Sequence, residues 1–254
     1  MTRGLFVTGT DTGVGKTFLA SALASALCGR GCRVGVMKPA ESGCARAGGR
    51  LVPQDAELLM RASGCTSPMK DVNPYALATP LAPALAAERE GVEIDLAHIL
   101  DCFDRVAASH DLVIVEGAGG LLTPLVGSQT IRDLAALLGL PLLIVARNVL
   151  GAINHTALTA AAARDAGPEI AGLVLNDVGS YADDAMITNA AALRRWGGAP
   201  LIAHVPYIPA GDVDAAATAG QELADRLAVW LGVTSVSLLP PPPEGSGRKA
   251  SLQK

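Results

Sequence analysis

The segment GTDTGVGKT, from Gly9 to Thr17, decides the fold of this chain. It follows the apolar run LFVT and precedes the helix-like segment FLASALASAL. A glycine-rich stretch that ends in Gly-Lys-Thr between a strand and a helix is typical of a phosphate-binding loop, since its backbone N–H groups and the helix N-terminus attract anions. We therefore expect Lys16 to contact nucleotide phosphates and Thr17 to hold Mg²⁺ through its hydroxyl; the alternative is a chance glycine-rich turn.

Short runs rich in leucine and β-branched residues recur along the rest of the chain, and longer segments of helical pattern separate them. Because these runs are apolar on both faces, they are typical of strands buried in a parallel sheet. Such alternation predicts a doubly wound α/β fold of the P-loop NTPase kind, in one domain over residues 1–234. We expect strands at 5–9, 33–38, 111–117, 140–146, 170–176 and 200–206, and helices near 16–28, 55–62, 95–108, 131–138, 153–166, 183–196 and 217–231.

Composition narrows the possible functions. Hydrophobic residues make up 50% of the 254 residues and charged residues 17%, so the chain can bury a large core and is not mainly disordered. A net charge of −4 and only 3% aromatic residues argue against nucleic-acid binding. Five cysteines without a CxxC pair argue against a disulfide framework or a zinc site. We find neither a signal peptide nor an apolar run of membrane-spanning length, and we expect a cytoplasmic protein.

Two segments depart from the alternation of strands and helices. Residues 39–53, PAESGCARAGGRLVP, are expected to form a long flexible loop, and loops of that length in compact domains are often functional. After about residue 235 the chain becomes rich in proline, glycine, serine and basic residues. Because such a segment has little to bury, we expect a flexible tail over residues 235–254.

Polar residues at the ends of predicted strands indicate where a ligand would bind. Lys38 closes the second strand, and the carboxyl ends of parallel strands border the ligand crevice, so this lysine could meet an anion beside Lys16. Ser42 could hydrogen-bond the same ligand. Glu116 lies at the end of the strand 111–117, a usual position for a magnesium ligand. Asp55 opens the helix expected after the loop 39–53, and it could also be a helix cap. A solvated lysine at a strand end is the alternative for Lys38.

Small and amide-bearing residues after other strands suggest close contact with a nucleotide. Asn176 ends the strand 170–176, and its amide could pair with a nucleobase edge, although a turn would also explain it. Small residues directly after Glu116 permit close approach of a ligand to the backbone. These residues are Gly117, Ala118 and Gly119, and the residues that could wall the base are Pro206, Tyr207 and Ile208.

Six segments, GTDTGVGKT, KPAESG, VEGAGGLLTPL, LGAINHTALT, GLVLNDV and VPYIP, occur in this order and together resemble the dethiobiotin synthetase family of biotin biosynthesis. The resemblance covers about residues 4–210. The long spacing of the phosphate-binding loop, with five residues between its first glycine and Gly15, is itself a feature of that family. The resemblance implies a mainly parallel sheet of seven strands and a homodimer. It also implies Mg²⁺, ATP, CO₂ or bicarbonate, and 7,8-diaminononanoate as ligands.

The resemblance further implies roles for individual residues. Lys38 matches the active-site lysine of the family, and Lys16 and Thr12 would share the catalytic site with it. Thr12 would contact the diamine or its carbamate, and Ser42 the substrate. Leu150, Gly151 and Asn154 would receive the substrate carboxylate from the partner subunit, and a helix N-terminus predicted there would attract that anion. The implied nucleotide ligands are Gly13, Val14, Gly15, Lys16, Thr17, Phe18, Asn176, Asp177, Pro206, Tyr207 and Ile208, with Asp212 and Asp214 as further candidates, and the implied Mg²⁺ ligands are Thr17, Asp55 and Glu116.

Two other functions are alternatives to this one. A nucleotide-switch ATPase of the chromosome- and division-positioning family shares the long loop, but such proteins carry a second lysine near its start, where this chain has Thr10, Asp11 and Thr12. A glutamine-dependent amidoligase would need an appended glutaminase. The family chemistry would proceed through a carbamate and its phosphorylated anhydride, and the choice between ATP and CTP stays open.

Overall fold

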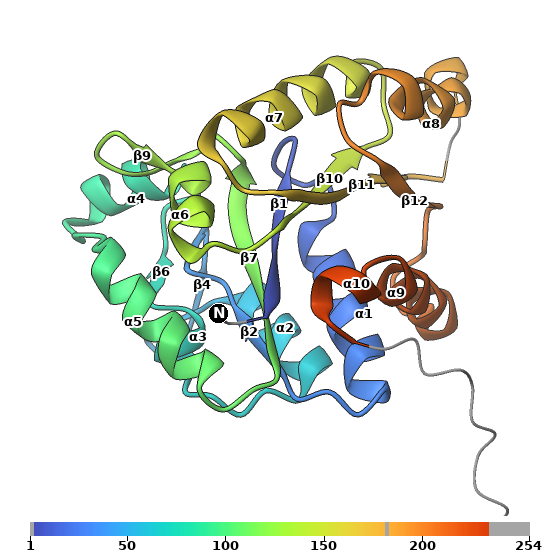
Figure 1. Cartoon of the computed structure of the whole chain (residues 1–254). Coiled ribbons are helices and arrows are strands. Elements are labelled where there is room, and N and C mark those ends of the chain that lie inside the picture. Colours follow the sequence, from blue (N-terminus) through green and yellow to red (C-terminus); the bar gives the residue numbers. More distant parts are fainter. Residues whose placement is uncertain (1–2, 181–182, 234–254) are drawn as a thin grey trace, which may run out of the picture.

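The computed structural model describes residues 3–180 and 183–233 of the chain. Its centre is a parallel sheet in the strand order β12-β11-β10-β1-β7-β2, with helices on both faces (Figure 1). The strands are β1 (Gly4–Gly9), β2 (Val34–Met37), β7 (Leu112–Gly120), β10 (Leu142–Arg147), β11 (Ile170–Asn176) and β12 (Leu201–Val205). The prediction of a doubly wound α/β fold is therefore confirmed, with strand ends close to those expected.

The order of the strands locates the ligand crevice. From β1 the chain first runs to β2 at one edge and returns to β7, and it later builds β10, β11 and β12 on the other side of β1. Ligands of open α/β sheets bind where the strand order reverses, at the carboxyl ends of the strands. The loop after β1, which is the phosphate-binding loop, therefore begins at the expected crevice.

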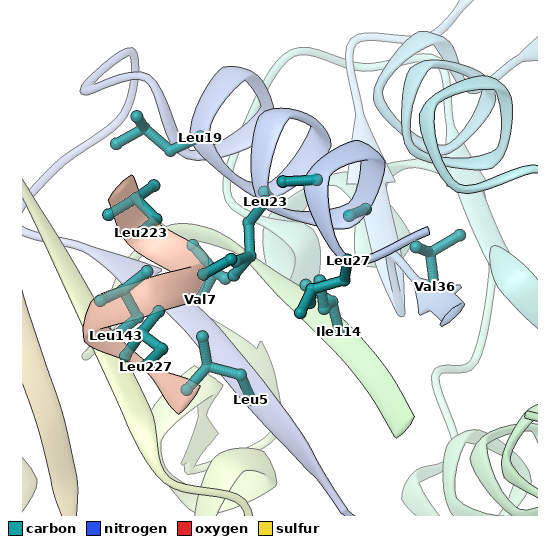
Figure 2. Close-up of a cluster of buried hydrophobic side chains, with 14 of the residues drawn as sticks. Leu5, Val7, Leu19, Leu23, Leu27, Val36, Ile114, Leu143, Leu223 and Leu227 are labelled. Atoms are coloured by element: carbon teal, nitrogen blue, oxygen red, sulfur yellow. The ribbon is translucent and has the colours of Figure 1, made fainter. Parts of the chain in front are cut away.

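Successive side chains of a strand point to opposite faces of the sheet, so alternate residues pack into two separate hydrophobic cores. Leu5 and Val7 of β1 face the layer formed by α1, α2, α9 and α10, whereas Phe6 faces the layer that includes α5 and α6. Figure 2 shows the first core, in which leucines of α1 and α9 cover β1, β7 and β10. The longer helices are α1 (Lys16–Gly29), α2 (Gln54–Ser63), α4 (Pro83–Glu90), α5 (Leu96–Ala107), α6 (Ile131–Leu138), α7 (Ala152–Ala166), α8 (Asp184–Trp196) and α9 (Val213–Arg226), and the short ones are α3 (Met69–Val72) and α10 (Ala228–Leu231).

The expectation of a long flexible loop over residues 39–53 is wrong. This stretch contains β3 (Ala40–Ser42) and a hairpin of β4 (Ala45–Ala47) and β5 (Arg50–Val52). Gly48 and Gly49 connect the hairpin with φ values of 58° and 79°, the left-handed conformation that a two-residue hairpin turn requires. All three residues of β4 are exposed, so no alternation of apolar and polar residues marks the strand in the sequence.

The main sheet contains six strands within residues 3–180 and 183–233, one fewer than the resemblance implied. The chain leaves the sheet after β2, because Pro39 has no amide hydrogen for a ladder and the Lys38 amide bonds to the carbonyl of Val72 instead. The following strand, β3, pairs with β6 (Tyr75–Leu77) in a separate two-stranded sheet. A further hairpin, β8 (Pro124–Val126) with β9 (Gln129–Thr130), follows β7.

Helices over the described ranges are too short or too polar to cross a membrane. The predicted tail at residues 235–254 lies outside the described residues, so its expected flexibility and the domain boundary at residue 234 stay predictions.

Candidate nucleotide and active site

The phosphate-binding loop leads from the end of β1 into α1. Gly13 and Gly15 have φ values of 71° and 98°, a conformation that favours glycine, and Gly15 is the N-cap of α1. A Cβ atom on Gly15 would overlap the side-chain amide of Asn176. That amide comes from the end of β11 and donates a hydrogen bond to the carbonyl of Val14 at 2.9 Å. Asn176 therefore holds the loop in place, a contact between residues far apart in the chain.

Substitution of Gly15 by alanine should weaken binding of Mg-ADP by about tenfold or more, since a left-handed conformation costs a non-glycine residue about 1–2 kcal/mol and 1.4 kcal/mol is tenfold. Displacement of Asn176 would add to that loss. Gly31→Ala is the matched control, because Gly31 also has a positive φ of 84° but faces open space. Calorimetry that gives the same nucleotide affinity for both variants would contradict the proposed role of the loop.

Lys16 begins α1 with its side chain buried at the cleft. Its Nζ donates to the carbonyl oxygen of Asp11 at 3.0 Å. Burial, followed by the charge of Lys38, lowers the pKa of Lys16 to about 8, and Glu116 and Asp55 offset only part of this. The charged form of Lys16 is destabilised in this way, so an anionic ligand would stabilise it strongly. This agrees with the prediction that Lys16 contacts phosphates.

Two acidic side chains contact Lys38 beside this loop, and a hydroxyl contacts one of them. Nζ of Lys38 donates to Oε1 of Glu116 at 2.5 Å and to Oδ2 of Asp55 at 2.8 Å. Burial alone would lower the pKa of Lys38, but Glu116 and Asp55 outweigh it and raise that pKa above its ordinary value. Thr17 donates its hydroxyl to Oε1 of Glu116 at 2.8 Å. Residues from α1, α2, β7 and the end of β2 thus form one charged cluster.

The chemistry of this cluster fits Mg²⁺. Oε2 of Glu116 is completely buried and has no hydrogen-bond partner within the described part of the chain, so it can accept a cation. Mg²⁺ prefers oxygen ligands and is commonly held by one or two carboxylates together with substrate phosphates and water. Thr17, Asp55 and Glu116 supply oxygens of this kind next to Lys16.

These residues line one cleft with a volume of about 680 Å³. Most residues expected to bind phosphates, metal or substrate border this cleft. The lining also includes residues that the sequence did not single out, namely Glu41, Pro80–Pro83, Thr123 and Pro124. Burial raises the pKa of Glu41, although hydrogen bonds from two backbone amides partly offset this. The expected residues in the lining are Thr12, Gly13, Gly15, Lys16, Thr17, Phe18, Lys38, Ser42, Asp55, Glu116, Ala118 and Gly119.

A second cavity, of about 750 Å³, adjoins the first, and Gly15 and Phe18 line both. Its walls come from the end of β11, from the face of α1 and from the segment after β12. Oδ1 of Asp177 is held at 2.7 Å from Nδ2 of Asn148 and at 2.9 Å from Nε2 of His204. The expected base-site residues in this lining are Asn176, Asp177, Tyr207, Ile208 and Asp212.

Some expected residues are not brought to either cavity in the described structure. Val14 is buried beneath its loop, Pro206 is exposed, and the carbonyl of Gly117 lies 3.5 Å from Nζ of Lys38. Asp214 lies in the first turn of α9, whereas Asp212 caps that helix. The sequence pattern placed these residues close to the site along the chain, but the direction of each side chain depends on the tertiary structure.

The segment expected to receive a substrate carboxylate lies away from both cavities of the same chain. Leu150 is 85% exposed, and Asn154 is exposed in the first turn of α7. The helix begins at Ala152 with Gly151 at the cap position, so Asn154 lies inside the first turn. The first-turn N–H groups still make this end of α7 favourable for an anion.

Comparisons with known proteins agree with this arrangement. A family model described as an AAA domain matches residues 3–213. The ATP-dependent dethiobiotin synthetase BioD of Anaeromyxobacter dehalogenans (strain 2CP-C) is 50% identical over 207 residues, which cover 82% of this chain and 91% of that protein. The enzyme of the same name from Bacillus subtilis (strain 168) is 39% identical over 206 residues, with coverage of 81% and 88%.

Solved structures with the same fold are more distant in sequence. The septum site-determining protein MinD of Pyrococcus horikoshii, complexed with Mg-ADP, superposes with a TM-score of 0.56 at 18% identity and covers 89% of this chain and 96% of its own. A ParA family ATPase from Chlorobium tepidum gives 0.52 at 16% identity, with coverage of 91% and 95%. At such identities the likeness concerns the fold alone. The sequence relatives, in contrast, match at up to half of all positions and over most of their length, and they show that this chain belongs to the ATP-dependent dethiobiotin synthetase family.

Proposed function

We propose that this protein converts 7,8-diaminononanoate, CO₂ and ATP into dethiobiotin, ADP and phosphate. Family membership makes it an ATP-dependent enzyme of the ligase class. The observation that carries the proposal is the convergence of Lys16, Lys38, Asp55 and Glu116 at one cleft that continues into a second cavity. The first cavity offers cations and metal ligands for a phosphate chain, and the second offers space for a nucleobase.

The two cavities suggest how the nucleotide would lie. The base would occupy the cavity near Asn176 and Tyr207, and the phosphates would pass Gly15 toward Lys16, because Gly15 and Phe18 line both spaces. Thr17, Asp55 and Glu116 would hold Mg²⁺, which would neutralise phosphate charge when it is bound. The choice between ATP and CTP would depend on the walls of the base cavity.

The part of the cleft near Thr12, Lys38 and Ser42 would take the diamine and its carbamate. One amine would attack the carbon of CO₂ and lose a proton to give the carbamate. A carbamate oxygen would then attack the γ-phosphorus and release ADP. Attack of the second amine on the carbamate carbon would expel phosphate, and loss of its proton would complete the cyclic urea.

The charges at the cleft explain how the chain would promote these steps. The carbamate and the γ-phosphate are both anions and repel each other. Lys16 and Lys38, both nearly buried, can offset this repulsion and stabilise the charge that develops during phosphoryl transfer. Alignment of the two reactants in one cleft supplies much of the remaining rate enhancement, in the best cases about 7–11 kcal/mol.

A homodimer would complete the site. The exposed start of α7, with Leu150, Gly151 and Asn154, would bind the carboxylate of a diamine held in the partner subunit. The position of these residues outside the cleft of their own chain supports this proposal.

The proposed role of α7 predicts the effect of Asn154→Ala. This change should raise KM for the diamine by about tenfold, the usual effect of about 1.4 kcal/mol, and leave ATP affinity unchanged. Asn154→Asp should raise KM further, because a negative charge would repel the carboxylate. Steady-state kinetics with each substrate varied in turn would measure both effects. An equal loss of ATP affinity would show that the change acts only on the fold.

Phosphate release with Mg-ATP and bicarbonate, with and without 7,8-diaminononanoate, tests the proposed function directly. Strong stimulation by the diamine, together with a cyclic urea detected by mass spectrometry, is the expected result. A slow ATPase that ignores the diamine but responds to lipid or a protein partner would overturn the proposal in favour of a switch ATPase. The same assay with CTP would decide the nucleotide preference.

A further inference from the structure

Glu41 connects two walls of the cleft through hydrogen bonds to the protein backbone. It lies in β3, between Lys38 and Ser42 in the sequence, and the residue is only 7% exposed. Its Oε1 accepts a hydrogen bond from the amide of Asp55 at 2.9 Å, and its Oε2 accepts one from the amide of Ala56 at 3.1 Å. Both carboxylate oxygens therefore bind the first turn of α2.

The start of α2 needs such an acceptor from elsewhere in the chain. The first N–H groups of a helix have no partner within the helix, and a side chain at the cap position usually supplies one. Here the cap position is Pro53, whose side chain has no hydrogen-bonding atom. Glu41 supplies the missing acceptors from 14 residues away, and its negative charge also favours the positive end of the helix.

The helix turn that Glu41 holds carries Asp55, one of the acidic residues that face Lys38. The side chain of Asp55 is 37% exposed, so packing restrains it far less than the completely buried Glu116. Its backbone is fixed by Glu41, and its carboxylate lies 2.8 Å from Nζ of Lys38. The position of the Asp55 carboxylate therefore depends on the carboxylate of Glu41.

We propose that Glu41 is a positioning residue, which anchors the N-terminal turn of α2 and thereby holds Asp55 where metal and phosphate would bind. This inference rests on the proposed function, since that function gives Asp55 its role at the metal. Groups that orient a metal ligand without touching the metal commonly change metal affinity or activity by about 10–100-fold when they are replaced.

Glu41→Gln tests the inference with little change in shape. The amide keeps one acceptor oxygen but presents an NH₂ group to the second backbone N–H. We expect kcat to fall by about 10–100-fold and the Mg²⁺ concentration for half-maximal turnover to rise about tenfold, with KM for the diamine within about twofold of wild type. Glu41→Asp keeps the charge and two acceptors, and it should recover part of the loss.

Two measurements without turnover separate positioning from a direct role in the reaction. Calorimetric titration of Mn²⁺ into the ADP-bound protein should show about tenfold weaker binding in Glu41→Gln. Hydrogen exchange of the unliganded protein should be faster at the amides of Asp55 and Ala56 and unchanged in the main sheet. The faster exchange would follow from the loss of the acceptor at these amides.

Asp95→Asn provides a matched control. Asp95 caps α5 by accepting the amide of Ala97 at 2.9 Å, and it does not border the cleft as the described residues define it. This variant should retain wild-type Mg²⁺ dependence. Equal losses in both variants, or a Glu41→Gln variant with normal Mn²⁺ binding and normal Mg²⁺ dependence, would overturn the inference. Wild-type protein that forms no dethiobiotin in the same assay would instead overturn the proposed function.

Discussion

Lys16→Ala is expected to abolish nucleotide-dependent turnover, with kcat/KM for ATP lowered by about 10³–10⁵-fold, the range that a charged side chain on a transferring phosphoryl group commonly supplies. The wild-type ammonium group is nearly buried beside the phosphate-binding loop and donates a hydrogen bond to the carbonyl oxygen of Asp11 at 3.0 Å. Burial and the neighbouring Lys38 already lower the pKa of Lys16 to about 8, so a phosphate anion would be its natural partner.

Lys70→Ala is the matched control for Lys16→Ala. Lys70 is an exposed lysine on the short helix α3 and borders neither cavity in the described structure. Phosphate release at varied ATP concentration should be unchanged in this variant. If Lys16→Ala also retained near-normal activity, the assignment of Gly9–Thr17 as the phosphate-binding loop would have to be abandoned.

Lys38→Met is expected to lower kcat by about 10²–10³-fold and to change ATP affinity only slightly, because one preorganised electrostatic contact to the transition state commonly contributes that much. The methionine keeps the volume of the side chain but removes the charge that would face the carbamate and the transferring phosphoryl group. Turnover and nucleotide binding, measured separately, would show whether the loss lies in the chemical step. Unchanged turnover would refute the role of Lys38.

The same variant should also lose stability in the absence of metal. Lys38 is the cation that lies against Asp55 and the completely buried Glu116, and an uncompensated buried charge typically costs about 3–5 kcal/mol of unfolding free energy. Mg²⁺ with ADP should restore part of that stability, because the cation would compensate the same carboxylates. Urea unfolding with and without Mg-ADP would measure the effect. A variant as stable as wild type without metal would contradict this explanation.

The main sheet was predictable because its strands are buried on both faces. β1 and the first six residues of β7 are wholly buried, so each appears in the sequence as an uninterrupted run with few polar residues. The small sheet of β3 and β6 and the hairpin of β4 and β5 were not predicted. Their strands are short, and those of the hairpin lie largely at the surface, so the sequence carries no clear period of two there.

The candidate site was predictable where its residues follow a strand directly. Lys38 directly follows β2, Lys16 begins the helix after β1, and Glu116 lies within β7, which continues to Gly120. Parallel strands bring these segments to one edge of the sheet. The roles of Asn176 and Glu41 were not predictable in the same way. Each depends on the direction of one side chain toward backbone atoms of another segment.

The sequence by itself therefore determined the α/β class, the phosphate-binding loop and the family, because short motifs and buried runs are local properties of the chain. Only the tertiary structure decided which groups meet. It joined Asn176 to Val14 across 162 residues, and it capped the first turn of α2 with a carboxylate from β3. Hydrogen bonds between distant segments leave no periodic pattern in the sequence, since their geometry exists only after the core has packed.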